Sequence, residues 1–172
     1  MSLPPRILCA IGLFATLSCG TPTRAQPTDA LTRAQTAYTA GDYETAINRL
    51  HQSAATDTSA HALYLLGRSH QALLQHEAAL KALHRAYQLD SLSTPILQAQ
   101  GRSYEVLSRL EDAEDVYARA LAIAPSRALH LALAGLYHRM HAWKEATYHY
   151  RVLLQRDSTN SLLHGRLAQT LQ

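Results

Sequence analysis

GRSYEVLSRLEDAEDVYARALAIAP, residues 101–125, is the stretch that decides the fold of this 172-residue chain. Its first part has Gly101 three residues before Tyr104, and its second part has Ala113 four residues before Tyr117. Residues three or four apart lie on one face of a helix, so the stretch predicts two consecutive helices. Small residues such as Gly101 and Ala113 let two helices cross at the close end of the usual range of about 8–10 Å. We therefore expect the two helices to pack against each other as a pair.

The same pattern recurs along the chain every 33 or 34 residues. The alanine of the second helix returns as Ala46, Ala79, Ala113 and Ala146, and the small residue twelve positions earlier as Ala34, Gly67, Gly101 and Ala134. A large residue follows each alanine by four positions, at Leu50, Leu83, Tyr117 and Tyr150. A bulky side chain precedes it by three, at Tyr43, His76, Leu110 and Trp143. A period of this length predicts an array of stacked units.

These columns resemble the tetratricopeptide repeat (TPR), a pair of antiparallel helices repeated about every 34 residues. The third copy carries the likeness best, and residues 41–47, GDYETAI, are typical of the family's turn. The resemblance implies an all-α fold, a right-handed α-solenoid of antiparallel helix pairs. It covers about four repeats, near residues 27–59, 60–93, 94–126 and 127–160. It also implies a non-catalytic scaffold that binds a peptide or a partner helix in a concave groove.

The composition agrees with a helical fold, since a chain that is 47% hydrophobic and 17% charged is too apolar for disorder. The pattern predicts nine helices, near 28–40, 43–54, 59–73, 76–89, 94–107, 110–123, 127–140, 143–156 and 161–171. Residues 161–172 repeat the start of a first helix. We expect them to be either a capping helix or the start of a fifth repeat, as in a TPR segment of a larger envelope protein.

The first 25 residues differ from the rest. Arg6 is followed by an apolar run, ILCAIGLFATLSC, at residues 7–19. Thirteen residues of helix span about 20 Å, less than the roughly 30 Å of a bilayer core. The run therefore predicts a secretory signal peptide, residues 1–25, because the small Thr23 and Ala25 stand before a cut that would leave Gln26 first. The protein is then exported, periplasmic or secreted. The alternatives are a lipid on Cys19, which would make an envelope lipoprotein held at the membrane, and an uncleaved N-terminal anchor.

Net charge and cysteine content exclude some classes of function and fold. The net charge of +3 would fall to +1, since Arg6 and Arg24 leave with the signal peptide. So small a charge, and the lack of a regular base-reading pair, disfavour the alternative of a nucleic-acid-binding helical repeat protein. Two cysteines are too few for a disulfide-rich scaffold. We expect a protein or peptide partner and no nucleic acid.

No pattern of polar residues predicts catalysis or a metal site. The acidic cluster at residues 111–115 falls at a predicted helix start, where carboxylates complement the helix dipole. His138 and His141 are three residues apart on one predicted helix, but no third ligand has a suitable spacing. We therefore expect no enzyme, no cofactor and no metal.

The concave groove of such an array is formed by first helices. The residue after each small crossing residue, and those four before and three after it, share one helical stripe. The candidate groove residues are Tyr38, Tyr64, Arg68, Gln71, Gln98, Arg102, Glu105, Leu131 and His138. Two arginines, one repeat apart, predict a preference for acidic segments, strengthened below about pH 6.5 by His61 and His138. The alternatives are that the arginines pair only with Glu105 or another local carboxylate, or that this stripe is a solvated face.

Overall fold

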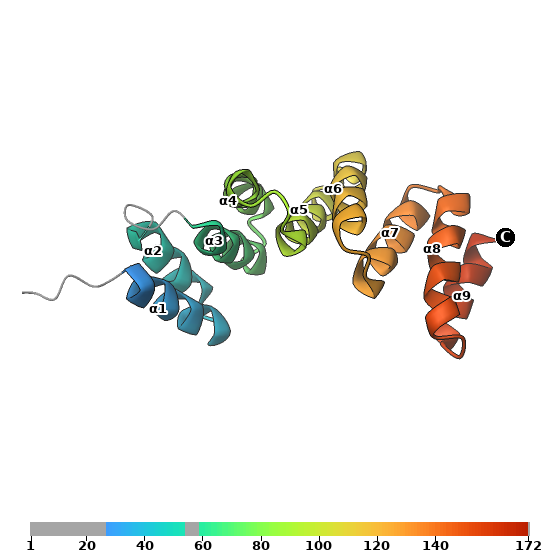
Figure 1. The fold of residues 1–172 in the computed structure, drawn as a ribbon, viewed down its shortest axis with the longest axis horizontal. Helices are drawn as coiled ribbons and strands as arrows, with labels where there is room; N and C mark the ends of the chain where they lie inside the picture. Colours follow the sequence, from blue (N-terminus) through green and yellow to red (C-terminus); the bar gives the residue numbers. More distant parts are fainter. Residues whose placement is uncertain (1–26, 54–58, 172) are drawn as a thin grey trace, which may run out of the picture.

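The computed structural model describes residues 27–53 and 59–171, which form nine α-helices and no strand (Figure 1). The helices are α1 (Pro27–Thr39), α2 (Tyr43–Ser53), α3 (Ala60–Ala72), α4 (His76–Leu89), α5 (Thr94–Val106), α6 (Leu110–Ile123), α7 (Arg127–Arg139), α8 (Trp143–Arg156) and α9 (Ser161–Thr170). They follow one another along the long axis of the molecule. Within each of four pairs, α1·α2 to α7·α8, the two helices make their most extensive contacts with each other. The predicted all-α solenoid is confirmed, and each helix end lies within two residues of its predicted position.

The turn inside each pair has one backbone geometry. The residue seven positions after the small crossing residue takes a positive φ, at Gly41 (82°), Leu74 (60°), Ser108 (58°) and His141 (58°). The next amide closes the helix end, as Gln75 N donates to His70 O at 2.9 Å in the second pair. This is the glycine-favoured left-handed helix end, and glycine occupies it in one of the four copies. The other three copies hold a residue with a β-carbon in a strained conformation.

Leu74 offers a direct test of that strain. Its side chain is 79% exposed, so removing it sacrifices little packing. We expect Leu74→Gly to raise the free energy of unfolding by about 0.5–1 kcal/mol, because the left-handed conformation costs an L-residue about 1–2 kcal/mol and glycine loses more freedom on folding. Urea denaturation measures this change in the free energy of unfolding. Lys81→Gly, an exposed position inside α4, is the control and should be destabilising; destabilisation of both variants would contradict the assignment of strain to this turn.

The crossing columns are buried as their spacing predicts. Ala34, Ala46, Ala113 and Ala146 are fully buried. At Gly67 an added β-carbon would lie 2.6 Å from Leu83 Cγ, and at Gly101 it would lie 2.5 Å from Tyr117 Cζ. The large residue of the second helix therefore occupies the space that the glycine of the first helix leaves open.

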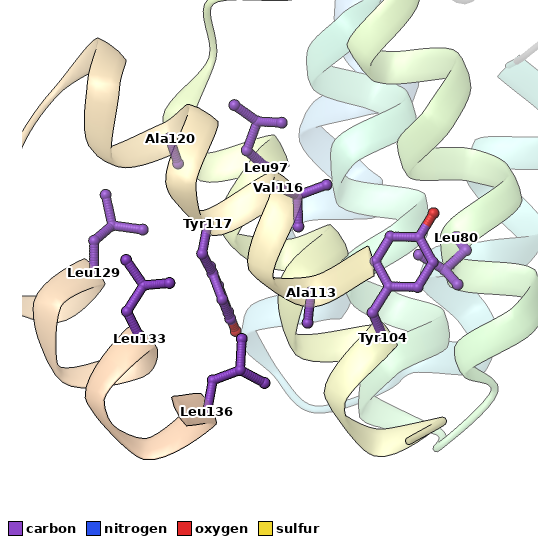
Figure 2. Close-up of a cluster of buried hydrophobic side chains, with 10 residues drawn as sticks. All are labelled: Leu80, Leu97, Tyr104, Ala113, Val116, Tyr117, Ala120, Leu129, Leu133 and Leu136. Atoms are coloured by element: carbon purple, nitrogen blue, oxygen red, sulfur yellow. The ribbon is translucent and has the colours of Figure 1, made fainter. Parts of the chain in front are cut away.

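The core continues from one repeat to the next. Figure 2 shows its largest cluster, with side chains from α4, α5, α6 and α7: Leu80, Leu97, Tyr104, Ala113, Val116, Tyr117, Ala120, Leu129, Leu133 and Leu136. Tyr117 lies between α6 and α7 and is 2% exposed. Three further clusters extend this packing toward both ends of the described chain. Because the clusters join neighbouring pairs, each repeat is stabilised by the repeats beside it as well as by its own helix pair.

The terminal segments bear on two predictions. The predicted signal peptide, the cut before Gln26 and the lipid site Cys19 all lie outside the described residues. None of the helices in 27–53 and 59–171 has the length and apolar character needed to cross a bilayer. At the other end α9 packs on α8, with Leu163 buried against Tyr150 and Leu153. Ala168, which continues the small-residue column, is exposed.

Candidate functional site

Successive first helices contact each other in the N-terminal half of the array. α1 contacts α3, and α3 contacts α5, whereas no successive second helices make equally extensive contacts among the described residues. The first helices are therefore closest to one another between α1 and α5, and the predicted groove stripe lies on first helices.

Two tyrosines and an arginine come together on α1 and α3. Arg68 Nη1 donates to the hydroxyl of Tyr64 at 3.0 Å, and its guanidinium lies 5.9 Å from the centre of that ring. Burial alone would lower the pKa of Arg68, but interactions with Tyr64 and with Tyr38 of the neighbouring repeat outweigh it and raise the pKa. Arg68 is thus a half-buried cation held between aromatic side chains of two repeats.

Arg102 lies one repeat further along and is exposed. It forms no hydrogen bond and no ion pair with any residue in the described part of the chain. The carboxylate nearest in sequence, Glu105, accepts a hydrogen bond from Tyr117 at 2.7 Å and pairs with Arg139 at 3.2 Å. The alternative in which Arg102 is neutralised by Glu105 does not hold in this structure.

Three of the predicted groove residues are engaged within the protein. Gln71 Nε2 donates to Ala99 O at 2.6 Å and to Ser103 Oγ at 2.7 Å, which ties α3 to α5. Glu105 ties α5 to α6 and α7 through the two contacts given above. The His138 ring lies 5.2 Å from the Trp143 ring, and its Nδ1 is buried without a hydrogen-bond partner.

The remaining members of the stripe are available to a partner. Gln98 is half-buried and Leu131 is 49% exposed. His61 is exposed, with its ring 6.5 Å from that of Tyr64. Two histidines were expected to add charge at mildly acidic pH. His61 is exposed, whereas His138 is half-buried.

Comparison with known proteins agrees with this architecture. The family model for subunit 3 of the anaphase-promoting complex, or cyclosome, matches residues 9–86. A crystal structure of MamA is 23% identical, with a TM-score of 0.75 over 78% of this chain and 80% of that one. A tetratricopeptide repeat protein from Parabacteroides merdae is 18% identical, with a TM-score of 0.76 over 84% of this chain and 59% of that one. The chain has the TPR fold.

A third structural neighbour is a much longer chain. It belongs to the Cut9–Hcn1 heterotetramer of the anaphase-promoting complex and is 17% identical, with a TM-score of 0.74 over 86% of this chain and 30% of that one. At these identities the likeness shows the fold. No curated protein matches the chain at a significant level of sequence similarity.

The acidic residues at the start of α6 form pairs with neighbouring side chains. Within residues 27–53 and 59–171, no three side chains of the metal-binding types come together. In the acidic cluster, Asp112 pairs with Arg109 at 2.8 Å, Asp115 pairs with Arg119 at 3.3 Å, and Glu114 accepts a hydrogen bond from Tyr137.

One polar cluster has no counterpart among the predicted site residues. His149 of α8 is 7% exposed, and its Nδ1 lies 2.9 Å from Nδ1 of His130 on α7. Its ring stacks on Tyr137, with 5.6 Å between ring centres and 9° between planes. The column spacing places His149 three residues after Ala146, where Val116 stands in the third repeat. The same column holds Arg49 in the first repeat, so a polar residue at this position did not by itself mark the cluster.

Proposed function

We propose that this TPR protein is a non-catalytic interaction scaffold that binds an acidic, extended segment of a partner protein in its concave groove. The observation that carries the proposal is Arg102, an exposed cation on the groove stripe without a hydrogen bond or ion pair among the described residues. A guanidinium forms a two-pronged hydrogen bond with a carboxylate, so Arg102 is suited to recognise aspartate or glutamate.

The neighbours of Arg102 suit a peptide. Toward the N-terminal end, Tyr64 and Tyr38 place aromatic surface around Arg68. Tyrosine gives large contact area at a low cost in side-chain entropy. Leu131 offers an exposed apolar contact on the other side of Arg102. The groove thus alternates cationic and apolar positions, which favours a segment with alternating acidic and apolar side chains.

Charge reversal in the groove tests this proposal. The probe is a labelled peptide of alternating glutamate and leucine. We expect Arg68→Glu with Arg102→Glu to weaken its binding by about tenfold or more, because hydrogen bonds to charged groups contribute about 1.5–3 kcal/mol. Fluorescence anisotropy at fixed pH and salt measures binding, and circular dichroism melting confirms the fold.

The matched control is Arg85→Glu, an exposed position on the second helix α4. It should leave probe binding unchanged. Equal affinities for the wild type and the double variant, with equal melting curves, would refute the groove as the site. An equal loss in the Arg85→Glu control would show that the probe responds only to total charge.

We also propose that the protein is exported, as a periplasmic or secreted species. The support is the short apolar run of residues 7–19 with Thr23 and Ala25 after it. Expression with the native N-terminus, followed by intact mass measurement of the exported fraction, should give a chain that begins at Gln26. A chain that begins at an acylated Cys19 would establish the lipoprotein instead, and retention of Met1 would contradict export by cleavage.

A further inference from the structure

An open hollow of about 290 Å³ lies between α7 and α8. It is lined by Tyr137, Lys144, Glu145, Tyr148 and His149. Four of these five residues belong to α8, a second helix, so the hollow is separate from the groove stripe on the first helices. Neither the scaffold function nor the comparisons account for it.

His149 leaves one ring nitrogen available in this hollow. The residue is more than nine-tenths buried, and its Nδ1 is engaged with His130 at 2.9 Å. Its Nε2 makes no hydrogen bond with any described residue. Two ring nitrogens in contact share one proton. With that proton on Nδ1 of His149, its Nε2 has a lone pair, whereas with the proton on Nδ1 of His130 the Nε2 of His149 carries a hydrogen. Desolvation lowers the pKa of His149 to about 4, so the ring is uncharged near neutral pH, and the tautomer with the proton on its Nδ1 can accept a hydrogen bond at Nε2.

Carboxylates and aromatic rings complete the surroundings. The hydroxyl of Tyr137 donates to Glu114 Oε1 of α6 at 2.8 Å. Desolvation, then Glu114 and then Glu145 raise the pKa of Tyr137 to about 12, which places both carboxylates near its hydroxyl. Tyr148 is 60% exposed and turns a second ring toward solvent. Lys144 is the one cationic side chain that lines the hollow among the described residues.

We propose that this hollow binds a cationic side chain of a protein partner, the guanidinium of an arginine or the ammonium of a lysine. The cation packs on the ring of Tyr148, pairs with Glu145 and donates a hydrogen bond to Nε2 of His149. Each of these is a recognised contact of such cations, and together they need an aromatic face, a carboxylate and a neutral acceptor in one place. The hollow supplies the first two, and it supplies the third when Nδ1 of His149 carries the proton shared with His130.

The test uses N-acetylarginine amide as the probe and N-acetylglutamine amide as its uncharged counterpart. Ring-proton shifts of Tyr148 and His149 in NMR spectra report binding at this site and not in the groove. We expect saturable shifts with the arginine probe and none with the glutamine probe. Glu145→Gln and Tyr148→Ala should each weaken binding by about fivefold, the size of one exposed ion pair or cation–π contact.

Lys144→Gln is the matched control, since it removes the opposite charge from the same wall. It should leave the affinity for the arginine probe unchanged or raise it. Tighter binding in Glu145→Gln with weaker binding in Lys144→Gln would identify an anion site and overturn the proposal. Absence of shifts at His149 and Tyr148 up to 50-fold excess over about 1 mM protein would overturn it as well.

Discussion

Gly101→Ala should lower the free energy of unfolding by about 1–2 kcal/mol, although alanine is the better helix former by about 1 kcal/mol. The added β-carbon would meet the ring of Tyr117 at Cε1, and would lie 2.5 Å from Cζ and 2.8 Å from Cδ1. That ring is 2% exposed and is fixed by its hydroxyl, which donates to Glu105. The ring cannot turn aside without breaking this bond, so α5 and α6 must separate.

Gly135→Ala is the matched control for this substitution. Gly135 is also helical, but nothing lies within 4 Å of an added β-carbon. We expect this variant to be more stable than the wild type by about 0.5–1 kcal/mol. Urea denaturation of both proteins measures the two effects, and the account requires opposite signs. Stabilisation by both substitutions would show that α5 and α6 do not cross at Gly101.

Acidification should destabilise the fourth repeat through His149. Desolvation first, and the charge of His130 second, lower the pKa of His149 to about 4, below its ordinary value of 6.5. The unfolded chain therefore binds the proton more tightly than the folded chain. The contribution to stability is complete above about pH 6.5 and is lost as the pH falls toward 4. Between pH 7 and 4.5 we expect a loss of about 2 kcal/mol.

His149→Phe tests that assignment, because phenylalanine keeps a ring against Tyr137 and cannot be protonated. Its free energy of unfolding should vary much less between pH 7 and 4.5 than that of the wild type. His61→Phe, at an exposed position on α3, should retain the wild-type dependence. If His149→Phe keeps the full pH dependence, other groups cause it.

The fold could be predicted from the sequence because the residues at the helix crossings must be small, and they recur once in every repeat. Ala113 and Gly101 are buried as their columns predict, and Gly101 stands opposite Tyr117, the bulky residue of its own repeat. The turn geometry could be predicted from the sequence only in part. Gly41 marks the left-handed position, whereas Leu74 and Ser108 adopt it without a glycine because the helix-end hydrogen bonds impose it.

The groove was predictable as a stripe but not residue by residue. Helical spacing shows which side chains share a face, yet it does not show which of them reach the neighbouring repeat. Gln71 contacts Ser103, and Glu105 contacts Arg139, 32 and 34 residues away along the chain. Such pairs depend on the stacking distance and on side-chain length together. The same holds for His130 and His149, which meet only once α7 and α8 are packed.

The most direct test of the groove is a charge-reversal rescue. The variant with Arg68→Glu and Arg102→Glu is measured by anisotropy against the glutamate–leucine peptide and against its lysine–leucine counterpart, at fixed pH and salt. Recognition by the two arginines predicts that the wild type prefers the glutamate peptide and the variant prefers the lysine peptide. Retention of the wild-type preference by the folded variant would contradict recognition of acidic segments at this groove.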